Sequence, residues 1–132
     1  MKALDTNILA RYLLGDDLRQ AEAAARLLES GERWFVPVTV ALELAWVLRS
    51  EGVAKTDVIT AFRHAQALPG MAWQFAGEWR QALAWAEGGL DVADALHLAL
   101  AGKCEAMLTF DERFAARAGR EGARPEVVLA GE

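Results

Sequence analysis

Four acidic side chains stand in apolar surroundings, where an unpaired charge is unfavourable. Asp5 ends the short apolar start of the chain, and Asp111 follows the apolar segment AMLTF. Glu43 is the only charge in VPVTVALELAWVL, and Asp94 interrupts LDVADALHLALA. Removing a lone carboxylate from water is costly unless a partner or a metal ion compensates the charge. Together, the four predict a carboxylate cluster that binds a hard cation such as Mg²⁺ or Mn²⁺.

Each of these residues also has a purely structural explanation. Asp5 and Asp111 could each cap the helix that follows, and Asp91 could cap its own helix. Glu43 could lie on the surface of an amphipathic helix, although its apolar neighbours argue against that. The structural explanation is adequate for any one of these residues. It explains all four together less well, because they lie at separate element ends and in apolar helices, as a convergent cluster would require.

Other site chemistries find less support. His64 and His97 fall in different helices, and Cys104 follows a helix end, so zinc-binding spacing is absent from the sequence. His97 shares a predicted helix face with Asp91 and Asp94, but a packed or hydrogen-bonded histidine is the expected reading. The sequence has no P-loop, no dinucleotide-binding glycine motif and no G-x-S-x-G motif.

The composition indicates one globular domain over residues 1–132, with 54% hydrophobic and 25% charged residues. No apolar run is long enough for a membrane span or a signal peptide. Because Cys104 has no partner for an internal disulfide, a cytoplasmic location is expected. The net charge of −5 argues against a broad basic nucleic-acid surface, although bound cations could supply positive charge locally.

Hydrophobic patterns predict short strands separated by helices. Strands are expected at 1–4, 34–38, 71–75, 106–110 and 126–129, and helices at 6–14, 18–30, 39–50, 55–68, 78–87, 92–101 and 112–118. Thr39 and Thr56 are expected to cap two of these helices. The alternation predicts an α/β three-layer sandwich with a mainly parallel central sheet. Since ligands bind beyond the carboxyl ends of parallel strands, Asp5 and Asp111 should face the same rim.

Four segments resemble the PIN-domain family, in particular the VapC toxins of bacterial toxin–antitoxin pairs. They are LDTNIL, the helix carrying Glu43, DVADALHLA and LTFDERF, and they occur in the family's order over nearly the whole chain. The D-T-N opening and the D-x-x-D-A-L-H-x-A segment are fairly specific together, whereas either alone would be weak.

The resemblance implies particular roles for individual residues. Asp5, Glu43, Asp94 and Asp111 would be the catalytic acids that hold Mg²⁺ or Mn²⁺, with Asn7, Thr109 and Asp91 in support. All of these positions carry the residue that the family pattern leads us to expect, so an active protein is predicted. The cations would neutralise the scissile phosphate and activate a bound water.

The resemblance also implies a function, a Mg²⁺- or Mn²⁺-dependent endoribonuclease that is the toxin of a VapBC-type system. Its expected partners are RNA, a cognate VapB-like antitoxin and a second copy in a homodimer, with no membrane association. The alternatives are a PIN-domain nuclease that acts in RNA processing or on DNA, and a PIN-like module that binds without cleaving. For each of Arg11, Arg49 and Arg113 an exposed, solvated arginine is expected, with a phosphate contact as the alternative. Core packing is expected for each of Trp46, Trp79 and Trp85, with apolar groove or dimer contacts as the alternative.

Overall fold

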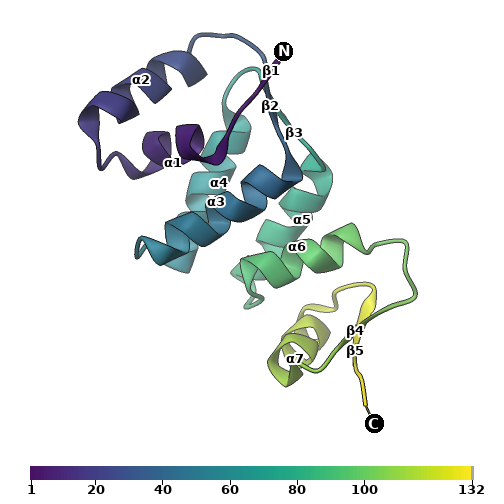
Figure 1. Ribbon diagram of the computed structural model, residues 1–132. Helices are drawn as coiled ribbons and strands as arrows, with labels where there is room; N and C mark the ends of the chain where they lie inside the picture. The colour runs from purple at the N-terminus through teal and green to yellow at the C-terminus, as the bar shows by residue number, and fades with distance from the viewer. Residues whose placement is uncertain (132) are drawn as a thin grey trace. The chain divides into compact units, whose positions relative to one another are not determined.

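The computed structural model describes residues 1–131, and the chain folds into two compact units (Figure 1). The first unit is Met1–Gln74 and the second is Phe75–Glu132. Each unit combines helices with parallel strands, so each is described separately. No helix among residues 1–131 is long and apolar enough to cross a membrane.

Three short parallel strands organise the first unit. They are β1 (Lys2–Ala3), β2 (Trp34–Val36) and β3 (Met71–Trp73), in the order β1-β2-β3. Phe35 of β2 lies opposite Ala3 on one side and Ala72 on the other. Parallel strands cannot be joined by a tight hairpin, so helices must connect them.

Four helices make these connections and bury the apolar side chains of the first unit. They are α1 (Thr6–Leu14), α2 (Leu18–Leu28), α3 (Val38–Ser50) and α4 (Lys55–Ala67). Helix α1 packs against α2 and α3, while α4 packs against α3 and β3. Fully buried side chains from all four helices and from β2 form the core: Leu9, Leu28, Val36, Leu44, Leu48 and Phe62.

The second unit consists of a helical pair and a small sheet. Helices α5 (Ala76–Glu87) and α6 (Val92–Leu100) pack together around buried Trp79, Leu83 and Leu96. Strands β4 (Ala106–Thr109) and β5 (Glu126–Leu129) pair in parallel, and α7 (Glu112–Glu121) connects them and packs on both.

The predicted α/β class with parallel strands is confirmed, but the two predicted threonine caps are wrong. Helix α3 begins at Val38 and α4 begins at Lys55, so Thr39 and Thr56 lie inside the first turns. The N-cap positions belong to Pro37 and Ala54, neither of which makes a side-chain capping bond. The ring of Pro37 already restricts φ to the −59° found there, so the chain enters α3 without a polar cap.

Two of the tryptophan expectations can also be resolved. The indole of Trp79 is fully buried, which confirms core packing at that position. Trp46 on α3 is 70% exposed, so core packing is wrong for it.

Candidate functional site

Asp5 connects the first strand to the first helix. Leu4 continues the β1 pairing by donating its N–H to the Phe35 carbonyl, at 2.9 Å. Asp5 is then the N-cap of α1, and its Oδ1 accepts from the Thr6 N–H at 2.8 Å. The expected N-cap position of Asp5 is therefore confirmed, but its exposed carboxylate accepts from the next residue and not from an N–H two or three residues on.

Glu43 is linked to the same helix end by a side-chain hydrogen bond. The Thr6 hydroxyl donates to Glu43 Oε1, and Thr6 is only 6% exposed. The bond joins residues on α1 and α3 that are 37 positions apart. Asp5, Thr6, Asn7 and Glu43 line one pocket of about 250 Å³, together with Ala10, Arg11 and Val47.

The prediction that apolar neighbours bury Glu43 is wrong. Helix α3 turns Ala41, Leu44, Ala45 and Leu48 into the core and leaves Glu43 exposed. The exposed face also carries apolar residues, so the sequence around Glu43 reads as apolar on every side. The carboxylate consequently remains in water, and its hydrogen bond to Thr6 orients it.

Asp111 occupies the equivalent position in the second unit. Asp111 is the N-cap of α7, where its Oδ1 accepts from the Phe114 N–H at 3.0 Å. Thr109 Oγ1 accepts from the Asp111 N–H at 3.0 Å, which fixes the backbone at the end of β4. The capping role of Asp111 is confirmed, and Thr109 lies where it supports that aspartate.

Asp94, like Glu43, lies inside a helix and does not cap one. It lies in the first turn of α6 and is half-buried. Its N–H donates to Asp91 Oδ2 at 3.3 Å, so Asp91 is confirmed as the cap of this helix. Burial raises the pKa of the Asp94 carboxyl, and the negative charges of Asp91 and Asp111 raise it further. His97 and Arg117 act in the opposite direction but do not cancel this effect.

The donor chemistry fits a hard divalent cation better than a soft one. The predicted site residues supply carboxylate oxygens, with Asp5 and Glu43 in the first unit and Asp91, Asp94 and Asp111 in the second. However, among residues 1–131, no three His, Cys, Asp or Glu side chains form a group that could hold a metal ion. Within the first unit Asp5 and Glu43 line one pocket, and within the second unit Asp91 and Asp111 raise the pKa of Asp94.

Thr6 is the residue that the sequence reasoning missed. It belongs to the D-T-N opening, but a buried threonine at the start of a helix normally reads as a packing residue. Only the pairing with Glu43, far away in sequence, reveals that Thr6 orients a carboxylate. No local spacing signal could have identified that partner.

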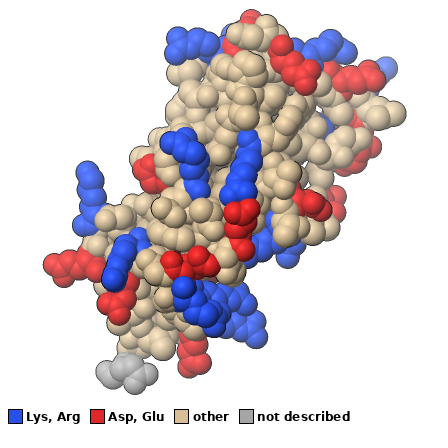
Figure 2. Space-filling model, turned by 180° about the vertical axis from the view of Figure 1, so that it is seen from behind, with Lys and Arg blue, Asp and Glu red and all other residues tan. Residues whose placement is uncertain are grey.

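The distribution of charge agrees with the acidic composition. On the face drawn in Figure 2, acidic and basic side chains are interspersed, and no continuous basic field is visible on the described residues. Favourable contact with a polyanion would therefore depend on local positive charge.

Comparison with known families covers both units. The family described as PIN domain matches residues 2–120, a range that includes all four acids of the predicted quartet. No curated protein matches the chain.

The raised pKa of Asp94 predicts an effect of Asp94→Asn on stability. The folded protein holds this proton more tightly than the unfolded chain, so ionised Asp94 reduces stability at neutral pH, and the penalty disappears as the pH falls through the folded pKa. Without metal at pH 7.5, Asp94→Asn should raise Tm by about 1–2 °C after allowing for solvent screening. Asp57→Asn is the matched control, because Asp57 also lies in the first turn of its helix. If calorimetry gave the same Tm shift for Asp94→Asn and Asp57→Asn, burial and the charges of Asp91 and Asp111 would not be the cause of the change.

The Thr6–Glu43 bond predicts a stability loss in Thr6→Val. Valine keeps the shape of threonine but removes the hydroxyl that donates to Glu43. We expect the free energy of unfolding to fall by about 1 kcal/mol in urea titrations, the usual contribution of such a bond. Thr60→Val is the control, since exposed Thr60 bonds only to its own helix, at the Thr56 carbonyl. A loss no larger than that of the control would show that the bond contributes nothing.

Proposed function

Because the chain belongs to the PIN domain family, whose members are generally metal-dependent nucleases, we propose that it is a Mg²⁺- or Mn²⁺-dependent endoribonuclease. The family match over residues 2–120 is the observation that carries the proposal. The carboxylates at the helix starts and on α3 and α6 are consistent with it.

The residues that would hold the cation are Asp5, Glu43, Asp94 and Asp111. When bound, such a cation supplies positive charge at the scissile phosphate and lowers the pKa of a coordinated water. Thr6 orients Glu43, and Thr109 fixes the backbone at Asp111. In this proposal Asn7 and Asp91 have supporting roles, Asn7 in the pocket shared by Asp5 and Glu43 and Asp91 beside Asp94.

Helix capping and metal binding are compatible roles for Asp5 and Asp111. Each capping bond uses Oδ1, so the second carboxylate oxygen can serve as a ligand. The capping bond also restricts the side-chain rotamer, which orients the carboxylate before any ligand arrives.

We propose further that this nuclease is the toxin of a VapBC-type pair, with a cognate VapB-like antitoxin and a homodimeric state. The support is the VapC-like arrangement of LDTNIL, DVADALHLA and LTFDERF in one short chain. A small antitoxin-like reading frame immediately upstream would favour this role over RNA processing or DNA cleavage.

The first prediction of this proposal concerns catalysis. The wild-type protein should cleave RNA with Mg²⁺ or Mn²⁺, and EDTA should stop the reaction. Asp5→Asn and Asp94→Asn should each lower kcat/KM by about a thousandfold or more, because each removes a proposed ligand charge. Glu22→Gln is the control, an exposed acid on α2 whose loss should leave the rate unchanged. The assay compares single-stranded RNA, tRNA, rRNA and flapped DNA on gels.

The outcomes separate the alternatives. Cleavage of DNA alone would overturn the RNA assignment, and tight RNA binding without turnover in either metal would favour a non-cleaving module. Cleavage that survives Asp94→Asn would remove Asp94 from the proposed site.

The second prediction concerns the toxin role. Expression of the wild-type chain alone should arrest bacterial growth, whereas Asp94→Asn should not, because the arrest would depend on cleavage. Co-expression with the product of the neighbouring small reading frame should restore growth and yield a co-purifying complex. Normal growth despite RNase activity in extracts would contradict the toxin role while leaving the nuclease proposal intact.

A further inference from the structure

Arg11 lies on the boundary between two hollows of the first unit. It lines the pocket that contains Asp5, Asn7 and Glu43, and it also lines a groove of about 670 Å³ between α1 and α2. Within residues 1–131, Arg11 is the one cationic side chain among the residues that line this acidic pocket.

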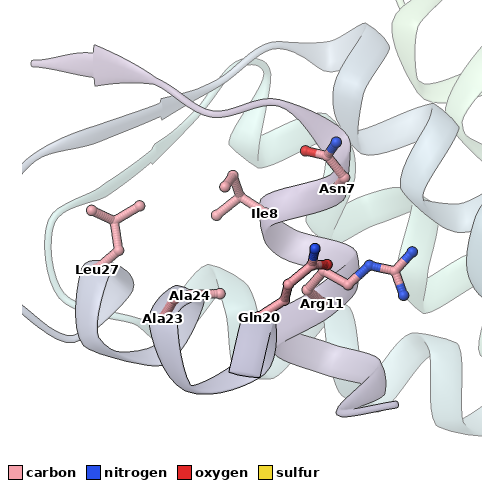
Figure 3. A pocket seen from close by; sticks show the side chains of 7 residues that line it. All are labelled: Asn7, Ile8, Arg11, Gln20, Ala23, Ala24 and Leu27. Carbon is pink, nitrogen blue, oxygen red and sulfur yellow. The ribbon is translucent and has the colours of Figure 1, made fainter. Parts of the chain in front are cut away.

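The close view of the groove shows how its two sides differ (Figure 3). Ile8 points across the groove toward α2, where Leu27 and Ala24 lie, so that side is apolar. The Arg11 guanidinium extends away from this apolar side, and Asn7 lies one helical turn before it on α1. Residues four apart share a helix face, which explains why Asn7 and Arg11 line both hollows.

The guanidinium of Arg11 is paired with a carboxylate from the next loop. Arg11 Nη1 lies 2.9 Å from both Asp16 Oδ1 and Asp16 Oδ2. Gly15, with φ of 65°, ends α1 in the left-handed conformation and turns the chain so that Asp16 follows at once. The Arg11 bond holds the pKa of Asp16 below its usual value.

This ion pair is accessible to an exchanging anion. The side chains of Arg11 and Asp16 are 37% and 49% exposed, and ion pairs in water contribute little to stability. A phosphate presents the same kind of oxygen pair to a guanidinium as a carboxylate does.

We propose that Arg11 binds a backbone phosphate of the RNA, with Asp16 as the internal anion that this phosphate displaces. The inference rests on the proposed ribonuclease function and adds a substrate-positioning residue to it. The acidic pocket by itself repels a polyanion, so a cation on its wall favours placing the strand beside Asp5 and Glu43.

The structure also distinguishes Arg11 from another arginine that the sequence offered for this role. Arg49 Nη1 donates to the Val53 carbonyl at 2.9 Å, beyond the end of α3, and lines neither hollow. The hydrogen bond of Arg49 is thus made to a backbone carbonyl four residues further along the chain. Arg11 combines a displaceable partner with a position on the pocket wall.

The test compares Arg11→Ala, Arg11→Lys, Asp16→Asn and a control, Arg26→Ala. Arg26 is an exposed arginine near the end of α2, and it lines neither hollow. Arg26→Ala therefore changes the net charge by the same amount as Arg11→Ala but leaves the lining of both hollows intact. Steady-state cleavage of a short single-stranded RNA gives kcat and KM. Binding of the same RNA without divalent metal, from 50 to 300 mM KCl, gives the dependence of Kd on salt. Circular dichroism melts confirm that each variant folds.

Arg11→Ala should raise KM and Kd by about five- to tenfold, with kcat nearly unchanged. It should also lower the slope of log Kd against log salt by about 0.7, the value for one phosphate contact on a single strand. Arg11→Lys should recover part of the affinity, since it keeps the charge but not the planar fork. Asp16→Asn should lower Kd about twofold, because no carboxylate then competes with the phosphate.

Equal changes in Arg11→Ala and Arg26→Ala would overturn the proposal, since net charge alone would then explain them. A fall in kcat with unchanged KM and unchanged salt slope would also overturn it. If the wild type cleaves RNA and Arg11→Ala matches it, only this inference fails. If the wild type neither binds nor cleaves RNA, the proposed function fails with it.

Discussion

Parallel strand pairing is the constraint on which the placement of the acidic residues depends. A strand in a parallel pair must end in a crossover, so its carboxyl end leads directly toward a helix. In both units the crossing has the same local form, in which a strand is followed by one apolar residue and then by an aspartate that caps a helix. Asp5 follows β1 in this way, and Asp111 follows β4. Sheet pairing thus fixes the positions of both carboxylates, and helix capping fixes how they are held.

The remaining two acids are held differently, and the difference matters for metal chemistry. Each capping carboxylate already accepts a backbone N–H at the start of its helix. Asp94 is half-buried, and the charges of Asp91 and Asp111 oppose its ionisation. Glu43 lies between these cases, since it is exposed to water but oriented by Thr6.

The sequence predicted the elements well because the apolar spacing and the turn residues are local signals. The ranges of α1 and β5 agree with prediction at both ends, and the strand-end positions of Asp5 and Asp111 follow from the same signals. The burial of Glu43 could not be predicted, since α3 has apolar residues on both its buried and its exposed faces. The Thr6–Glu43 bond escaped because its partners are 37 residues apart. Local patterns specify which residues form a helix, but side-chain partners depend on tertiary packing.

An acidic protein that binds a polyanion must confine its positive charge to the places where substrate is handled. The net charge of −5 weakens attraction to nucleic acid over the surface as a whole. A pocket lined by Asp5 and Glu43 strengthens that repulsion until a cation is present. The Arg11–Asp16 pair extends the same principle, because the guanidinium is neutralised by a neighbouring carboxylate while substrate is absent. The proposal gives this charge to a backbone phosphate that displaces Asp16, because a phosphate presents the same kind of oxygen pair to a guanidinium. In the proposed nuclease, binding of the phosphate backbone thus depends on competition between anions at one arginine and does not require a basic surface.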